Sequence, residues 1–96
     1  MGTVRVGEFE WDDAKAKANV RKHGVTFEEA MTVFLDELAV PFEEAEHPDR
    51  LLLVGESRLG RTVLVVFTER VARGTIRIIS ARRATKRERR AYVEGD

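Results

Sequence analysis

Apolar and polar positions alternate near the start of the chain, where Phe9 and Trp11 stand between acidic residues. A repeat of two residues is typical of a strand with one buried face. The next segment predicts a helix whose first turn is capped by Asp12 or Asp13. Its apolar stripe is narrow, and Gly24 is a natural C-terminal stop. A short strand followed by a weakly amphipathic helix is therefore expected.

A second helix is predicted to begin at Thr26, because Thr26 and Glu29 have the spacing of a capping box. Its apolar residues recur at helical spacing and stop near Asp36. The following segment, Leu38–Phe42, is rich in apolar residues but contains Pro41. Because proline cannot donate a backbone hydrogen bond to a neighbouring strand, this segment is predicted to be an edge strand or irregular.

The second half of the chain contains three β-rich runs joined by short turns, at Leu51–Glu56, Thr62–Glu69 and Thr75–Ala81. Short connections of this kind imply consecutive antiparallel hairpins. Residues 63–67 are apolar on both faces, so this run is predicted to be the central strand. A last helix is expected after the third run, because Thr85 and Glu88 repeat the capping-box spacing.

Together these elements predict an α+β fold in which two N-terminal helices and a C-terminal helix pack on an antiparallel β-sheet. The 96 residues fit one domain, residues 1–96, with a small hydrophobic core. A core of that size gives modest stability, so a binding partner is expected to add to it.

The charges are distributed unevenly although the formal net charge is zero, with 17 basic and 17 acidic residues. Residues 1–69 hold 8 basic and 14 acidic side chains, whereas residues 70–96 hold 9 basic and 3 acidic ones. Between Arg70 and Tyr92 the only acid is Glu88. Such a density of cations favours contact with nucleic acid or an acidic partner. The alternative is a solvated helix face, although such a face normally alternates in charge.

Composition excludes or disfavours several kinds of site and location. The chain has no cysteine, which excludes disulfides, thiolate catalysis and cysteine-rich zinc sites. The only histidines, His23 and His47, lie in different segments, so neither a metal site nor a cofactor is expected. No apolar run is long enough to span a bilayer, and the N-terminus lacks the apolar core of a secretory signal. A cytoplasmic protein that does not bind membranes is therefore expected.

A set of motifs runs in a fixed order through about residues 9–92. Its members are Trp11-Asp12, Asn19, Lys22-His23-Gly24-Val25, Phe27-Glu28-Glu29-Ala30, Val33-Phe34, Arg77, Ile79-Ser80-Ala81-Arg82, Glu88 and Tyr92. This set resembles the BrnT family of type II toxin–antitoxin toxins. One departure is Val66-Phe67, where the family pattern leads us to expect Val-Tyr or similar. The departure removes a possible phenol from the central strand.

The resemblance implies a fold similar to that of RelE and a ribonuclease toxin that cleaves RNA to inhibit translation and growth. It also implies neutralisation by a BrnA-like antitoxin, whose dimeric DNA-binding part represses the operon. The expected partners are an RNA substrate and a BrnA-like antitoxin, in a heterotetramer of two toxins on an antitoxin dimer. Operator DNA is expected to be bound only through the antitoxin. The expected activity is that of a metal-independent endoribonuclease.

Metal-independent RNA cleavage needs a base for the ribose 2′-hydroxyl, a cation at the phosphate and an acid for the leaving oxygen. Arg77 is the first candidate for the cation, because it is a lone charge on an apolar strand. The alternatives are an arginine on a solvent-exposed face or an ion pair with Glu69. His23 is the candidate proton carrier, because an imidazole exchanges protons near neutral pH. The alternative is a histidine that only caps the helix end.

Four further residues complete the predicted catalytic set. Lys22 could lie along the RNA backbone or be solvated, and Ser80 could bond a phosphate or simply end the strand. Arg82 lies close to the positive end of the last helix, where anions are favoured. Glu88 could assist proton transfer or anchor an arginine, or it could only complete the capping box. Contacts with RNA phosphates, or with acidic groups of the antitoxin, are predicted for Arg83, Lys86, Arg89 and Arg90.

The sequence leaves two alternatives to a ribonuclease. One is a non-catalytic nucleic-acid-binding domain with the same fold, and the other is a module whose basic face docks an acidic partner. The substitution Arg77→Ala is expected to separate these alternatives from catalysis. It should abolish RNA cleavage while leaving partner binding and the melting temperature nearly unchanged.

Overall fold

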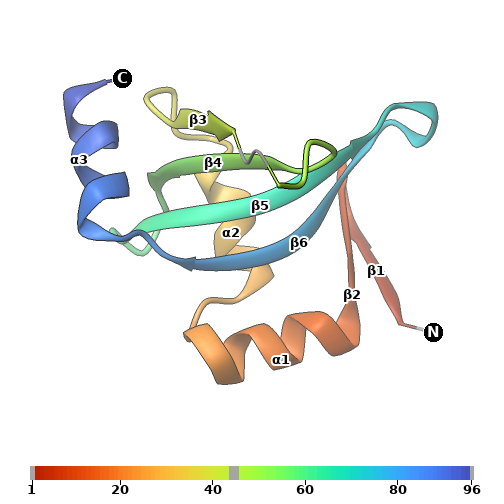
Figure 1. Ribbon diagram of the computed structural model, residues 1–96. Coiled ribbons are helices and arrows are strands. Elements are labelled where there is room, and N and C mark those ends of the chain that lie inside the picture. The colour runs from red at the N-terminus through yellow and green to blue at the C-terminus, as the bar shows by residue number, and fades with distance from the viewer. Residues whose placement is uncertain (1, 44–45, 96) are drawn as a thin grey trace.

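One sheet runs through the molecule and carries the helices on it (Figure 1). The computed structural model describes residues 2–43 and 46–95, and these residues form a six-stranded sheet in the order β1-β2-β6-β5-β4-β3. The strands are β1 (Thr3–Val6), β2 (Phe9–Asp12), β3 (Val40–Glu43), β4 (Leu51–Glu56), β5 (Thr62–Arg70) and β6 (Thr75–Arg83). The helices of the same part of the chain are α1 (Asp13–His23), α2 (Phe27–Val33), α3 (Lys86–Glu94) and a short 3-10 helix, η1 (Val71–Arg73).

The predicted α+β class, with two N-terminal helices and one C-terminal helix, is confirmed. The sheet is mixed rather than purely antiparallel, because β2 pairs with β6 in parallel, with Glu10 beside Arg77. These two strands are not hairpin neighbours, so no short turn fixes their relative direction. β1 is an additional strand that forms a hairpin with β2. Gly7 makes the tight turn between them, with a φ of 57° that a residue with a side chain rarely adopts.

The helices α1 and α2 pack against one face of the sheet (Figure 1). β5 contributes Val63 and Phe67 to the core on this face, and both are buried. Trp11 and Phe27 join β2 to α2 through an edge-to-face contact with ring centroids 5.9 Å apart. Leu64, which points to the other face, is only 2% exposed. β5 lies between β6 and β4 in the sheet, so the prediction of a central strand is confirmed.

Most helix ends follow the signals in the sequence. Asp12 caps α1 by accepting a hydrogen bond from the backbone N–H of Lys15, and Gly24 ends this helix with a φ of 70°. Thr85 and Glu88 form a complete capping box at the start of α3. These caps fix where α1 stops and where α3 starts, and both points lie at the same end of the sheet (Figure 1).

The edges of the sheet also agree with the sequence. β3 is the last strand in the sheet order and contains Pro41, as predicted for an edge strand. α3 does not lie flat on the sheet: it stands at the end where β4 finishes and β6 leaves the sheet (Figure 1). This end of the sheet therefore has a helix on either side of the last residues of β6.

Candidate functional site

Four segments meet at the end of the sheet where β6 finishes (Figure 1). They are the last turn of α1, the loop between β4 and β5 (residues 57–61), the end of β6 and the whole of α3. Each segment contributes cations. The region, which we call the basic end, contains Arg21, Lys22, Arg58, Arg61, Arg82, Arg83, Lys86, Arg87, Arg89 and Arg90.

Arg82 is held in a fixed orientation by Glu88. Its two terminal nitrogens donate to the two carboxylate oxygens of Glu88, each at 2.9 Å. One of these oxygens also accepts the backbone N–H of Thr85 at 2.9 Å, so the capping box and the ion pair share a carboxylate. Partial burial would raise the pKa of Glu88, but the hydrogen bonds from Arg82 and Thr85 hold that pKa below its ordinary value. Glu88 is therefore an ionised anchor for the guanidinium.

The two neighbouring arginines of β6 point to opposite faces of the sheet. Arg82 lies opposite Leu64, whereas Arg83 lies opposite Val63 on the face that carries α1 and α2. Arg83 is close enough to the buried Glu29 to help lower the pKa of that carboxyl. The two arginines therefore cannot both face the same side of the sheet.

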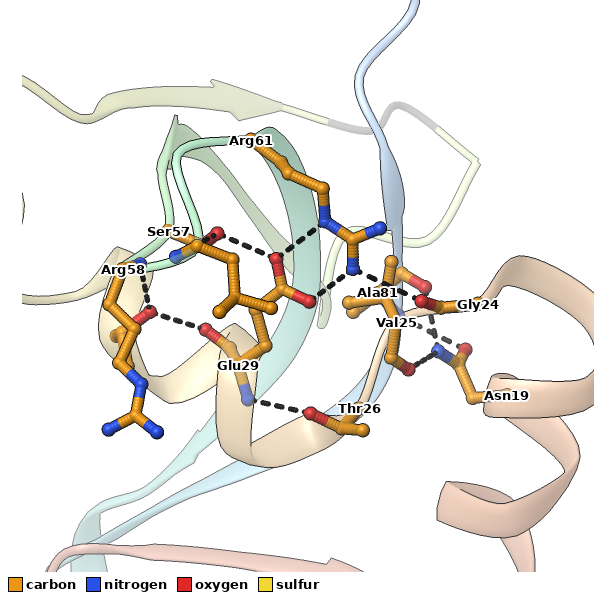
Figure 2. Close-up of polar contacts among 11 residues, drawn as sticks. Asn19, Gly24, Val25, Thr26, Glu29, Ser57, Arg58, Arg61 and Ala81 are labelled. Atoms are coloured by element: carbon orange, nitrogen blue, oxygen red, sulfur yellow. Dashed lines mark hydrogen bonds and ion pairs between the residues drawn. The ribbon is translucent and has the colours of Figure 1, made fainter.

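Asn19 of α1 closes the free edge of β6. Its amide nitrogen donates to the carbonyl of Ala81 at 2.7 Å, and its amide oxygen accepts the backbone N–H of Ala81 at 3.2 Å. The same nitrogen donates to the carbonyl of Val25 (Figure 2). Ser80 joins this arrangement through a longer bond of 3.4 Å from its hydroxyl to the amide oxygen. Ser80 is thus placed at the strand edge facing α1, two residues before Arg82.

His23 and Lys22 lie in the last turn of α1, where His23 is half-buried and Lys22 is exposed. Residues four apart share one side of a helix, so His23 follows Asn19 along the side that faces β6. Among the described residues, no hydrogen bond joins His23 to Arg77 or Arg82. The structure brings His23 to the same end of the sheet as Arg82, but not into its hydrogen-bonding shell.

Arg77 is paired with a buried carboxylate that sequence reasoning missed. It donates to Glu10 at 2.7 Å, and Glu10 is 0% exposed. Thr75 donates to the same carboxylate at 3.1 Å, and Arg73 lies 3.3 Å from it. The hydrogen bond from Arg77 is the main reason that the pKa of Glu10 is lowered in spite of its burial. The alternative ion pair with Glu69 is wrong, because that residue sits beside Ile76 in the register and so points to the opposite face of the sheet.

A second buried carboxylate, Glu29, anchors the loop between β4 and β5 (Figure 2). Arg61 donates to both oxygens of Glu29 and also to the carbonyl of Gly24, which ends α1. Ser57 donates to Glu29 at 2.6 Å. The hydrogen bond from Arg61 is the main cause of the lowered pKa of Glu29. Arg61 therefore connects the start of β5 to the end of the helix that carries His23.

The predicted capping box of α2 is only half formed. Thr26 accepts the backbone N–H of Glu29 at 2.9 Å, as expected. The carboxylate of Glu29 is turned toward Arg61 and Ser57 instead of toward the backbone of Thr26 (Figure 2). The capping-box spacing gave the helix start correctly, but it concealed the buried ion pair with Arg61.

Comparison with known proteins identifies the family. The sequence model for "Ribonuclease toxin, BrnT, of type II toxin-antitoxin system" matches residues 11–88. The chain belongs to the BrnT family. A 1.1 Å crystal structure of the Brucella abortus ribonuclease toxin, BrnT, is 28% identical to it in sequence and has a TM-score of 0.63, covering 79% of this chain and 94% of that chain. No curated protein matches the sequence.

Membership of the BrnT family confirms the resemblance seen in the sequence and the assignment to ribonuclease toxins. A toxin of a type II system implies an antitoxin partner and an RNA substrate. The comparisons assign no role to individual side chains, so the catalytic and RNA-binding residues stay predictions. Phe67, at the position where the family pattern leads us to expect a tyrosine, packs in the core against Phe34 with ring centroids 4.9 Å apart.

The remaining cations predicted to bind RNA lie on the outer side of α3 in this BrnT chain. Lys86, Arg89 and Arg90 are exposed, and their spacing places them on one side of the helix. Within residues 2–43 and 46–95, no three histidine, aspartate or glutamate side chains are gathered as ligands of a metal ion would be. No helix in this described part of the chain is long and apolar enough to cross a membrane.

Proposed function

We propose that this BrnT-family protein is a metal-independent endoribonuclease that cleaves at the basic end. The observation that supports this most strongly is the orientation of Arg82 by Glu88, with two hydrogen bonds of 2.9 Å. A guanidinium fixed in advance can stabilise the charge that develops on a phosphate without reorganising during the reaction. Of the N–H groups of Arg82 that Glu88 does not use, one donates to the carbonyl of Arg83 at 3.3 Å. The others are available for phosphate oxygens.

In the proposed reaction the ribose 2′-oxygen attacks the adjacent phosphorus, and the bond from phosphorus to the 5′-oxygen breaks. The base takes the proton of the 2′-hydroxyl, and an acid returns a proton to the leaving 5′-oxygen, which gives a 2′,3′-cyclic phosphate and a 5′-hydroxyl. His23 is proposed as a proton carrier in this scheme, with Lys22 and Ser80 beside the phosphate. Glu88 is assigned to orienting Arg82, because its lowered pKa keeps it ionised at neutral pH.

Arg77 takes a secondary place in this proposal. Its contact with the buried Glu10 satisfies a charge that would otherwise be isolated, which is a structural task. Its side chain is 24% exposed, so its other N–H groups still reach solvent on the open face of the sheet. Arg77 lies near the start of β6, about 16 Å along the strand from Arg82 and outside the basic end. We propose that Arg82 holds the scissile phosphate and that Arg77 contacts a more distant part of the RNA backbone. Arg83 and the α3 cations Lys86, Arg89 and Arg90 are proposed to contact further phosphates.

The proposed partner is a BrnA-like antitoxin that silences the toxin by covering the basic end, in a heterotetramer of two toxins on an antitoxin dimer. Cleavage of RNA by the free toxin is proposed to inhibit translation and growth, and operator DNA is proposed to be bound through the antitoxin alone. Light scattering on the purified complex measures the stoichiometry. A complex of one toxin with one antitoxin contradicts the heterotetramer.

A non-catalytic binding domain is the second candidate function. One observation favours it: both Arg77 and Arg82 already form ion pairs with carboxylates, as structural arginines do. Binding without cleavage predicts strong retention of RNA that falls steeply with salt but leaves the RNA intact. A basic end that only docks an acidic protein predicts weak RNA binding with little dependence on salt.

The substitution Arg82→Ala tests the proposed site, and Arg70→Ala is its matched control. The control substitution removes the same charge, but Arg70 is exposed and lies at the end of β5 that is away from the basic end. We expect Arg82→Ala to slow cleavage by about 10²–10³-fold, the usual effect of removing a charge-stabilising donor. The measurement is cleavage of a defined RNA in vitro, together with mapping of RNA ends after induction without the antitoxin. Cleavage at the wild-type rate by Arg82→Ala overturns the proposed site, and a loss of the same size in Arg70→Ala shows an unspecific effect of charge.

A further inference from the structure

α3 is attached to the rest of the fold by few contacts. None of its residues is fully buried. Among the described residues, its side chains form hydrogen bonds with the rest of the fold at two places, Glu88 with Arg82 and Tyr92 with Asp36. Glu88 and Tyr92 are four residues apart and so lie on the same side of the helix. A helix of this length is not stable by itself, so these two attachments determine whether it keeps its place.

The attachment through Tyr92 is strong and well anchored. The hydroxyl of Tyr92 donates to Asp36 at 2.6 Å, and Asp36 also accepts the backbone N–H groups of Glu56 and Leu38 at 2.8 and 3.0 Å. Asp36 is thereby fixed to the end of β4 and to the turn after α2. The bond to this carboxylate, together with burial, raises the pKa of Tyr92 to about 12. The phenol therefore stays a donor throughout the physiological pH range.

We propose that Tyr92 and Asp36 are positioning residues of the ribonuclease site, acting through α3 and Glu88 on Arg82. The inference rests on the proposed function, in which Arg82 holds the scissile phosphate. The path is continuous in the structure: Asp36 holds Tyr92 near the C-terminal end of α3, and Glu88, one turn earlier, holds both terminal nitrogens of Arg82. Misplacing a stabilising group by about 1 Å is enough to slow a reaction by about 10²-fold.

The substitution Tyr92→Phe tests this inference because it removes only the hydroxyl. Val4→Ala is the control. Val4 lies in β1, an edge strand of the sheet, and packs at the margin of the core. Its truncation should lower the stability of the protein without changing a contact of α3. We expect amide hydrogen exchange in residues 89–94 to accelerate at least about ten-fold in Tyr92→Phe and to stay unchanged in Val4→Ala, each relative to the wild-type protein. Exchange is measured well below the melting temperatures of both variants. We also expect kcat for RNA cleavage to fall about ten-fold in Tyr92→Phe with little change in KM, because an interaction of the transition state is weakened.

A double-substitution cycle shows whether Tyr92 acts through Arg82. If it does, adding Tyr92→Phe to Arg82→Ala causes little further loss of kcat, because the group that Tyr92 positions is already absent. The inference is overturned if the losses of kcat in the two single variants add up fully in the double variant. It is also overturned if Tyr92→Phe keeps the wild-type kcat while Arg82→Ala is inactive. A wild-type rate for Arg82→Ala overturns the proposed site and the inference together. The two failures are therefore distinguishable, and an equal loss of kcat in Val4→Ala assigns the effect of Tyr92 to stability alone.

Discussion

Within the described part of the chain, three arginines donate hydrogen bonds to carboxylates that lie in a different element. The pairs are Arg77 with Glu10, Arg61 with Glu29, and Arg82 with Glu88. The first two carboxylates are almost completely buried, and the third is partly buried. A buried carboxylate is tolerated only when its charge is paired and hydrogen-bonded, so each of these acids depends on its arginine.

At the scale of single residues, this dependence changes the expected result of Arg77→Ala. The substitution leaves Glu10 buried with only Thr75 and the more distant Arg73 as partners. We expect a loss of about 3–5 kcal/mol in the free energy of unfolding, measured by urea denaturation, and not the unchanged melting temperature that the sequence alone suggested. The matched control Arg70→Ala should change stability by less than about 0.5 kcal/mol. A stability loss that small in Arg77→Ala contradicts the structural role of the pair.

At the scale of elements, α1 and β6 are joined by a side chain that replaces a missing strand. β2 pairs with β6 only near the start of β6, at Ile76 and Arg77. Further along β6, the side chain of Asn19 supplies both a donor and an acceptor to the backbone of Ala81. Buried backbone groups are almost always paired, so this edge needs such a partner. Asn19 therefore determines how β6 lies against the helix that carries His23.

The substitution Asn19→Ala is expected to lower the free energy of unfolding by about 1–3 kcal/mol, because backbone groups of Ala81 lose their partner. Amide exchange at Ala81 should accelerate more than exchange at Val65, its neighbour on the inner side in β5. The control is Val20→Ala, next along α1 and already 43% exposed. Equal protection of Ala81 in the wild-type protein and in Asn19→Ala contradicts the strand-like role of the amide.

The elements themselves could be predicted because their signals are local. Alternating apolar residues located β2, and caps such as Thr85 and Gly24 located helix ends correctly. The parallel contact of β2 with β6 has no local signal, because the contacting residues Glu10 and Arg77 are 67 positions apart. For the same reason no local signal pairs Arg77 with Glu10 rather than with the nearby Glu69. An acid inside a short strand, Glu10, was the one hint that a buried pair was present.

At the scale of the whole molecule, stability should decrease in acid. The pKa values of Glu10, Glu29, Asp36 and Glu88 are all lowered in the folded protein, from ordinary values of 4.5 for glutamate and 3.8 for aspartate. The unfolded chain therefore binds more protons than the folded one at acidic pH. The stabilisation is fully present above the ordinary values and is lost as the pH falls through the lowered ones. We expect urea midpoints to be constant near neutral pH and to fall steadily below about pH 4.5. A midpoint that holds or rises down to pH 3 contradicts this expectation.

The parallel pairing of β2 with β6 has a consequence for how the toxin is made. β2 is synthesised before β6 and Arg82, and α1, α2, β3, β4 and β5 lie between them along the chain. The β2–β6 pair can form only after β6 has left the ribosome, because its two strands are separated by most of the sheet's other elements along the chain. A product that stops before β6 therefore contains neither the β2–β6 pair nor Arg82, the guanidinium proposed to hold the phosphate. Such a truncated chain is expected not to cleave RNA at the proposed site.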